Sequence, residues 1–339
     1  MAPQNRFRLY PLPGRRRLLK TGLLALAAPL APFAQPTAWP TRPISLIVPW
    51  PIGGGTDLTF RILADEAGER LGQPVNIINR PGAAGTLVAP LLKMAAPDGY
   101  TIGQLPITVF RYALMYSVAW DPIADLTPIL QISGTTFGLL VPSNSPWNTL
   151  EDMLRWARSH PNELLMGSTG IGTTAHLAME EIMQDRRISY THIPYKGTTD
   201  QMLALVNGTL MAGVNSTGFA PWVDQGKLRL LAIFSAQRSA KWPDVPTLRE
   251  LGFKQAIYTS PWGLAAPSGT DRNIIQTLHG VFRQATHSAR HIAELARYDQ
   301  EVAYLDTTAY RQAIALTVQH EKEMLTRMNL LGDRQKPQT

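Results

Sequence analysis

Three glycine-rich loops contain the residues of this chain that are best suited to binding chemistry. They span residues 49–57, 79–85 and 167–174, and each follows an apolar run typical of a strand and precedes a helical pattern. In an α/β fold such loops lie at the carboxyl ends of strands, where ligands bind. Glycine lets the backbone approach a ligand closely, and the N–H groups at the next helix start favour an anion. One such loop could be a simple tight turn, but three together predict an anion-binding site.

The side chains in these loops indicate a small anion. The hydroxyls are those of Thr56, Ser168, Thr169, Thr173 and Thr174, and Arg80 is the one cation. Neither a phosphate-binding P-loop motif nor a dinucleotide motif with its matching acidic residue is present in the sequence. Neutral donors suit a carboxylate with one or two charges better than a nucleotide.

Signals for catalysis or metal binding are weak. The sequence has no G-x-S-x-G nucleophile elbow, no H-E-x-x-H and no cysteine. His287 and His291 have metal-ligand spacing, but we interpret them as part of a solvated helix face in the polar tail. His176 could act as a base and Lys196 as a Schiff-base lysine, but a structural role is the simpler interpretation for both. We therefore predict no enzyme activity, no metal and no cofactor.

Charge and composition exclude several other classes of protein. The chain has 339 residues, of which 45% are hydrophobic and 17% charged, so it is long and apolar enough for two lobes with real cores. The formal net charge of +7 would suggest nucleic acid as a partner. However, residues 1–38 contain six basic residues and no acidic residue, and the remainder is nearly neutral. We therefore expect no nucleic-acid partner.

The basic N-terminus has the features of an export signal. Arg15 and Arg16 precede Leu-Leu-Lys, which resembles the twin-arginine motif, and an apolar run over 23–33 follows that is too short to span a bilayer. Small residues at Ala34 and Ala38 are the candidate cleavage points. An ordinary Sec signal is the alternative, and either route predicts a periplasmic mature protein.

From residue 44 onward, short β-rich runs alternate with helical patterns. This alternation predicts parallel strands with crossover helices. One series of elements ends near residue 105, a second begins near residue 137, and a mostly helical tail occupies 271–331. Within the second series, Thr149 and Asp152 predict a capping box for a helix over 150–159. We expect two α/β lobes joined by chain crossings.

Ordered motifs between residues 40 and 267 carry a resemblance to a known family. They read WPTRPISLIVPWPIGGGTD (39–57), LGQP (71–74), NRPG (79–82), APDGY (96–100), GSTGIGTTAHL (167–177), HIPYKG (192–197), GKLR (226–229), DVPT (244–247) and WGLAAP (262–267). Together they resemble the Bug family, the extracytoplasmic solute receptors of tripartite tricarboxylate transporters. The helical tail fits more loosely.

The resemblance implies a two-lobed periplasmic-binding-protein fold, type II-like, with the ligand cleft between the lobes. Residues 39–141 plus 255–339 would form lobe 1 and residues 142–254 lobe 2, after an export signal over 1–38. The implied function is capture of a small carboxylate for a tripartite tricarboxylate-type transporter. Its membrane subunits are the expected partners, and we expect a monomer.

In this family the carboxylate is held by main-chain N–H groups and hydroxyls of the first and third loops. Carried onto this sequence, the resemblance implies a ligand site made of Ile52, Gly53, Gly54, Ser168, Thr169, Gly172 and Thr173. Gly85 and Thr108 would lie at its periphery. Trp50 and Asn215 also belong to the predicted site, and both depart from the family pattern.

These two departures bear on the ligand. Asn215 stands in the segment after Gly208 where the family often has an acidic residue, and Trp50 replaces the commoner Phe. An acidic side chain would suit the ammonium group of an amino acid, whereas an amide suits a hydroxyl, a carbonyl or a second carboxylate. Trp50 offers a flat wall for an aromatic ring, and Trp50 and Trp262 could equally fill the core. We rank di- or tricarboxylates and aromatic carboxylates above amino acids, on the assumption that Asn215 faces the cleft; the sequence equally allows it to point away.

The sequence is also compatible with two other functions. One is an exported α/β enzyme that acts on a carboxylate through Lys196 or His176. The other is a sensing subunit that presents its ligand to a membrane sensor, which would use the same cleft.

Overall fold

A computed structural model describes residues 39–332. The predicted export signal and its cleavage points therefore lie outside the described residues. The strands are β1 (Ile44–Val48), β2 (Val75–Asn79), β3 (Thr101–Pro106), β4 (Leu126–Pro142), β5 (Leu165–Ser168), β6 (Thr191–Pro194), β7 (Ala212–Ser216), β8 (Leu228–Ile233), β9 (Thr259–Pro267) and β10 (Val302–Leu305). The helices are α1 (Gly55–Leu71), α2 (Val88–Met94), α3 (Thr108–Met115), α4 (Leu150–Ser159), α5 (Thr174–Asp185), α6 (Thr198–Val206), α7 (Ala220–Asp224), α8 (Arg272–Thr286), α9 (Ala289–Arg297) and α10 (Thr307–Arg327), with 3₁₀ turns η1 (Ala83–Gly85) and η2 (Thr217–Phe219).

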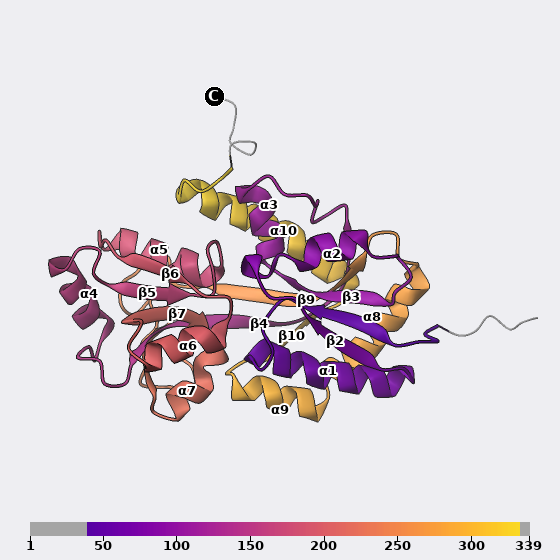
Figure 1. The fold of residues 1–339 in the computed structure, drawn as a ribbon, viewed down its shortest axis with the longest axis horizontal. Helices are drawn as coiled ribbons and strands as arrows, with labels where there is room; N and C mark the ends of the chain where they lie inside the picture. The colour runs from indigo at the N-terminus through magenta and orange to yellow at the C-terminus, as the bar shows by residue number, and fades with distance from the viewer. Residues whose placement is uncertain (1–38, 333–339) are drawn as a thin grey trace, which may run out of the picture. The chain divides into compact units, whose positions relative to one another are not determined.

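The strands follow the order β2-β1-β3-β9-β4-β7-β5-β6, with β8 and β10 also paired to β4. β4 is the longest strand: residues 126–136 pair with β9, and residues 137–142 pair with β7 and β8. It therefore runs from one lobe into the other, as Figure 1 shows. We call the elements around β1, β2, β3, β9 and β10 lobe 1, and those around β5 to β8 lobe 2.

Helices cover both faces of the lobe 1 sheet. On β1, Leu46 and Val48 pack with α1, α8 and α9, whereas Ile47 packs on the opposite face with α2, α3 and α10. The alternation follows from the two-residue period of a strand. Figure 1 shows α1 and α9 on one side of these strands and α2, α3 and α10 on the other.

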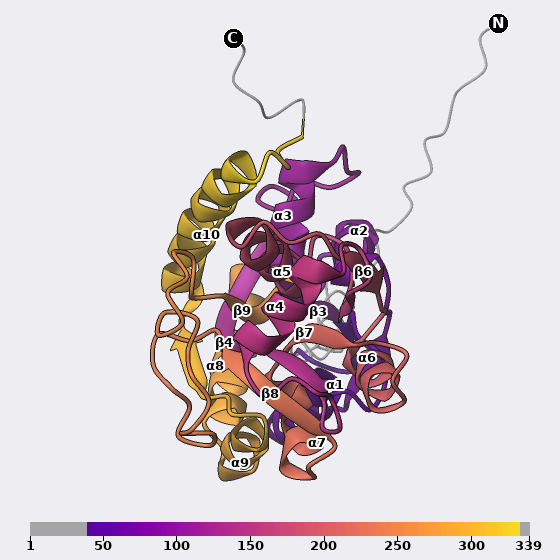
Figure 2. The same ribbon diagram turned by 90° about the vertical axis from the view of Figure 1, so that its left-hand side faces the viewer.

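Lobe 2 repeats this arrangement on a smaller scale. Leu139 and Val141 of β4 pack with α4 and α5, and Leu140 packs with α6 on the other face. Helix α4 spans Leu150–Ser159, and Thr149 and Asp152 form the capping box, so both predictions are confirmed. Figure 2, seen from the lobe 2 end, shows α4 and α5 on one side of β7 and α7 on the other.

Contacts between α3, α5 and α10 join the two lobes. Leu114 and Met115 of α3 form one apolar cluster with Leu177 of α5 and Leu325 of α10. Within residues 39–332, every helix is too short or too polar to cross a membrane.

Candidate functional site

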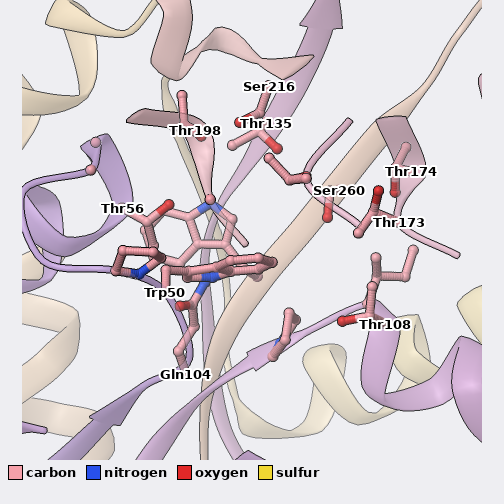
Figure 3. Close-up of a pocket in the computed structure, with 18 of the residues that line it drawn as sticks. Trp50, Thr56, Gln104, Thr108, Thr135, Thr173, Thr174, Thr198, Ser216 and Ser260 are labelled. Atoms are coloured by element: carbon pink, nitrogen blue, oxygen red, sulfur yellow. The ribbon is translucent and has the colours of Figure 1, made fainter. Parts of the chain in front are cut away.

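A cavity of about 80 Å³ lies between the lobes, where strands from both lobes end and helices begin. A cavity of this size has room for several waters or one small molecule. Figure 3 shows its polar residues around the ring of Trp50. The lining residues are Trp50, Pro51, Gly54, Gly55, Thr56, Gln104, Pro106, Ile107, Thr108, Thr135, Phe137, Thr169, Thr173, Thr174, Gly197, Thr198, Thr199, Ser216, Ser260 and Trp262.

Four helix N-termini converge on this cavity. Helices α1 and α3 of lobe 1 and helices α5 and α6 of lobe 2 each contribute residues of their first turn to the lining. Gly54 and Gly197, which precede α1 and α6, make no side-chain cap. Helix starts carry unpaired N–H groups and a partial positive charge. The cavity therefore favours an anion without using a cation.

Every side chain that lines the cavity is uncharged. Ten of the lining residues are Ser or Thr, and Gln104 is the one amide. Trp50, Phe137 and Trp262 supply the aromatic surface. This lining can bind a carboxylate through neutral donors, and it offers a buried ammonium group no counter-charge.

The ring of Trp50 rests against Gly85. A Cβ at Gly85 would lie 3.0 Å from two ring carbons of Trp50, and Gly85 has a φ of +85°. Only glycine fits this position without strain. The second glycine loop therefore supports the wall of the cavity from behind and does not line it.

Asp57 holds the first glycine loop in place. It is fully buried, accepts hydrogen bonds from the Gly53 N–H and the Asn79 amide, and pairs with Arg61 through both carboxylate oxygens. Burial by itself opposes ionisation of Asp57, but the hydrogen bonds from Arg61, Gly53 and Asn79 hold its pKa below the ordinary value. This charge therefore fixes the loop from outside the cavity.

A histidine pair lies behind the third glycine loop. The rings of His176 and His192 stack with their centroids 4.3 Å apart. His176 Nδ1 accepts the Gly172 N–H at 3.2 Å, and His192 Nε2 lies 2.8 Å from Ser168 Oγ. Burial lowers the pKa of both imidazoles to about 4, so both are neutral at pH 7. A neutral His176 is what the contact with Gly172 requires, because a protonated ring has no acceptor nitrogen.

Arg111 of α3 ties the third loop to lobe 1. Its guanidinium makes a two-pronged ion pair with Glu321 of α10, 2.9 Å from Nη2 to Oε1. The same group donates to the Gly172 carbonyl at 2.9 Å and to Thr174 Oγ1 at 3.2 Å. Arg111 is 1% exposed and Glu321 7% exposed. The sequence interpretation missed both, because no motif marks either of them.

The structure brings together only some of the residues that the sequence predicted for the site. Trp50, Gly54, Thr108, Thr169 and Thr173 line the cavity. Predicted residues that do not line it are Ile52, Gly53, Gly85, Ser168, Gly172 and Asn215.

These six residues are engaged elsewhere or face solvent. Ile52 is 72% exposed, and the Gly53 N–H is bonded to Asp57. Asn215 is fully buried and donates to Gln201 Oε1 at 2.6 Å, while its own oxygen accepts from Thr198 and Ser216. The side chain of Asn215 thus supports two lining hydroxyls from behind.

Three other predictions concern residues outside the cavity. Lys196 is exposed and does not line it, and His176 is occupied by Gly172 and faces Glu180 at 3.5 Å. His291 is fully buried and bonds the Thr286 carbonyl, so the prediction of a solvated face is wrong there. Within the described residues, no cluster of three or more metal-ligating side chains occurs.

The sequence matches one protein family over most of its length. Residues 59–330 match the model of the tripartite tricarboxylate transporter family receptor. A Cupriavidus necator protein named "UPF0065 protein in gbd 5'region" is 43% identical over 310 residues, covering 91% of this chain and 94% of that protein. BugT of Bordetella pertussis is 32% identical over 279 residues, covering 80% of this chain and 85% of that protein.

Solved structures share the fold described above. MatC from Rhodopseudomonas palustris, determined with bound malate, has a TM-score of 0.79 and 26% identity, over 84% of this chain and 99% of its own. R. palustris Rpa4515 with adipate has a TM-score of 0.82 and 25% identity, over 87% and 99% of the two chains.

Proposed function

Since this chain belongs to the tripartite tricarboxylate transporter receptor family, we propose that it captures a small carboxylate in the cavity between its lobes and delivers it to the membrane subunits of a tripartite transporter. The predicted family and the two-lobed fold are both confirmed. The observation that carries the proposal is the convergence of four helix N-termini on a cavity whose lining has no charged side chain. In this site the N–H groups and hydroxyls stabilise the carboxylate.

The lining also supports the ranking of ligand classes. From the sequence, di- or tricarboxylates and aromatic carboxylates ranked above amino acids on the assumption that Asn215 faces the cleft, but Asn215 lies behind it. The ranking now rests on a broader observation, that no acidic side chain lines the cavity. A buried ammonium group without a counter-charge is costly. Di- or tricarboxylates and aromatic carboxylates therefore fit better than amino acids, and the Trp50 face suits an aromatic ring.

Opening and closing of the lobes would admit and release this ligand. We propose the lobe boundaries at 141/142 and 254/255, close to the place where β4 passes from one set of partners to the other. A ligand that prefers the closed form raises the thermal midpoint by mass action. The protein acts as a monomer in this proposal, after export to the periplasm with cleavage near residues 34–38.

The competing functions have less support. An enzyme that used His176 or Lys196 would need these groups to face the ligand, and neither lines the cavity. Presentation of the ligand to a membrane sensor would use the same cavity, so binding data alone do not separate it from transport.

A binding panel tests the proposal. The mature protein is screened by thermal shift and then calorimetry against di- and tricarboxylates, aromatic carboxylates and amino acids. We expect one of the carboxylate classes to bind. Gly54→Val should abolish that binding, since Gly54 lines the cavity and its added Cβ meets only the Pro51 carbonyl at 3.7 Å. Gly280→Ala in α8, where a Cβ meets nothing within 4 Å, is the control. A strong, selective shift with an amino acid, or unchanged affinity in Gly54→Val, would contradict the proposal.

A further inference from the structure

Two buried oxygen atoms in the cavity wall have no hydrogen-bond partner. They are Gln104 Oε1 and Thr108 Oγ1. Gln104 is 2% exposed and Thr108 3% exposed, and both line the cavity.

The other hydroxyls around the cavity include several that are already engaged. Thr173 Oγ1 donates to the Gly170 carbonyl at 2.8 Å, and Thr174 Oγ1 accepts from Arg111. Thr198 and Ser216 donate to the Asn215 oxygen. Among the lining residues, Gln104 Oε1 and Thr108 Oγ1 are the side-chain atoms that are both buried and without a partner.

Such unpaired groups take their partner from a water or from a ligand group that enters the cavity. A buried polar group without a hydrogen bond is destabilising, and native proteins rarely leave one. Gln104 reaches the cavity from β3 and Thr108 from the start of α3, two residues beyond the end of that strand. Figure 3 shows the Gln104 side chain rising towards Trp50 and the Thr108 oxygen facing the middle of the cavity.

We propose that Gln104 and Thr108 form a subsite for a hydroxyl group of the ligand, so that the receptor selects a hydroxy-carboxylate over its deoxy analogue. This inference rests on the proposed function, because it assumes that the carboxylate is bound at the helix starts. The ligand hydroxyl donates to Gln104 Oε1 and accepts from the Thr108 hydroxyl.

The chemistry of the two groups favours a hydroxyl over other substituents. A second carboxylate has no proton to donate to Gln104 Oε1. An ammonium group could donate, but no acidic side chain lines the cavity to balance its charge. A methyl or methylene group would leave both oxygens unpaired. A hydroxyl both donates and accepts, so it has the two hydrogen-bonding functions that Gln104 Oε1 and the Thr108 hydroxyl require.

Matched ligand pairs test the subsite. L-malate is compared with succinate, citrate with tricarballylate, and 4-hydroxybenzoate with benzoate, by calorimetry on the mature protein. In the pair that fits the cavity, the hydroxylated acid should bind about ten- to a hundredfold more tightly than its deoxy analogue. Gln104→Leu and Thr108→Val should each reduce this ratio towards one, mainly by weakening the hydroxylated acid.

Controls separate this effect from misfolding and from failure of the proposed function. Gln131→Leu changes a buried glutamine that does not line this cavity and bonds the Ala303 carbonyl, and it should keep the preference. A far-UV circular dichroism spectrum and a urea midpoint close to those of the wild type show that Gln104→Leu is folded. Equal affinities within every pair in the wild type, or a preference that persists in both variants, would overturn the subsite while leaving carboxylate capture intact. Failure of all six acids to bind would contradict the proposed function itself.

Discussion

The buried ion pair between Arg111 and Glu321 predicts a large and testable effect on stability. Both side chains are nearly fully buried, and Arg111 also donates to the Gly172 carbonyl and the Thr174 hydroxyl. Arg111→Met would leave the Glu321 carboxylate buried without its partner. Removing one member of a buried pair costs about 3–5 kcal/mol, a large share of a typical folding free energy of about 5–15 kcal/mol.

The double variant separates charge from packing. Arg111→Met combined with Glu321→Leu removes both charges and leaves only the Gly172 carbonyl and the Thr174 hydroxyl without their donor. Leaving these two groups without a donor costs at most about 1–3 kcal/mol of stability each. Replacing a buried ion pair by apolar side chains often leaves the stability unchanged. We therefore expect the double variant to be more stable than Arg111→Met alone. With Glu321→Leu as the second single variant, the coupling energy should be about 2 kcal/mol or more.

Urea denaturation monitored by far-UV circular dichroism at pH 7.5 measures these differences. Arg42→Met is the matched control, because Arg42 pairs with Asp98 at the surface, where the two side chains are 61% and 43% exposed. Surface pairs contribute about 1 kcal/mol or less. A loss below about 1 kcal/mol in Arg111→Met, or strictly additive effects in the double variant, would refute the assignment of a buried, coupled pair that joins α3 to α10 and the third loop.

Three further predictions follow from the loops around the cavity. The depressed pKa of His176 and of His192, each about 4, means that the unfolded chain takes up protons first as the pH falls. Stability should therefore be complete above about pH 6.5 and decline as the pH falls towards 4, and a flat stability profile over this window would contradict the buried neutral pair. Gly85→Ala should destabilise the chain by about 1–2 kcal/mol, because Gly85 has a positive φ. It should also alter the tryptophan fluorescence, because the added Cβ meets the ring of Trp50. An unchanged urea midpoint and unchanged emission would count against that contact. Thr173→Val should lower the free energy of unfolding by about 1 kcal/mol, because it removes the side-chain cap of α5. Thr173→Ser keeps the hydroxyl and should have the wild-type urea midpoint. Equal urea midpoints in the wild type and both variants would exclude the cap.

Much of the fold could be predicted where local signals agree. The apolar run at β1, the glycine stop after α1 and the capping box of α4 each mark an element without help from the rest of the chain. Helix α3 and the first part of β4 carry no such signal. Pro128 and Gly134 are unfavourable in a strand, and the pairing of β4 with β9 shifts register between Pro128 and Leu130 and between Gln131 and Ser133, so the neighbouring strands keep this segment extended. Helix α3 is an almost uniformly apolar segment whose only charge, Arg111, is neutralised by a residue 210 positions away.

The site was predictable only in part. The glycine loops identify the helix starts, because glycine and hydroxyl residues are required there locally. Gln104, Ser260 and Thr135 lie on strands that meet only in the folded sheet, so nothing in their own neighbourhoods marks them. The direction of a side chain such as Asn215 depends on its partner Gln201, which the sequence does not identify. The positions of the site loops along the chain were thus easier to predict than the orientations of individual side chains.

Native mass spectrometry of the freshly purified mature protein tests most directly whether the cavity between the lobes captures a small carboxylate. The protein is exported, purified without dialysis, and analysed as wild type and as Gly54→Val, before and after addition of the carboxylate panel. We expect one small acid made of carbon, hydrogen and oxygen per wild-type chain, retained from the cell or taken up from the panel, and none on Gly54→Val. An amine or a phosphate compound at one per chain, the same acid retained by Gly54→Val, or no acid bound under either condition would contradict it.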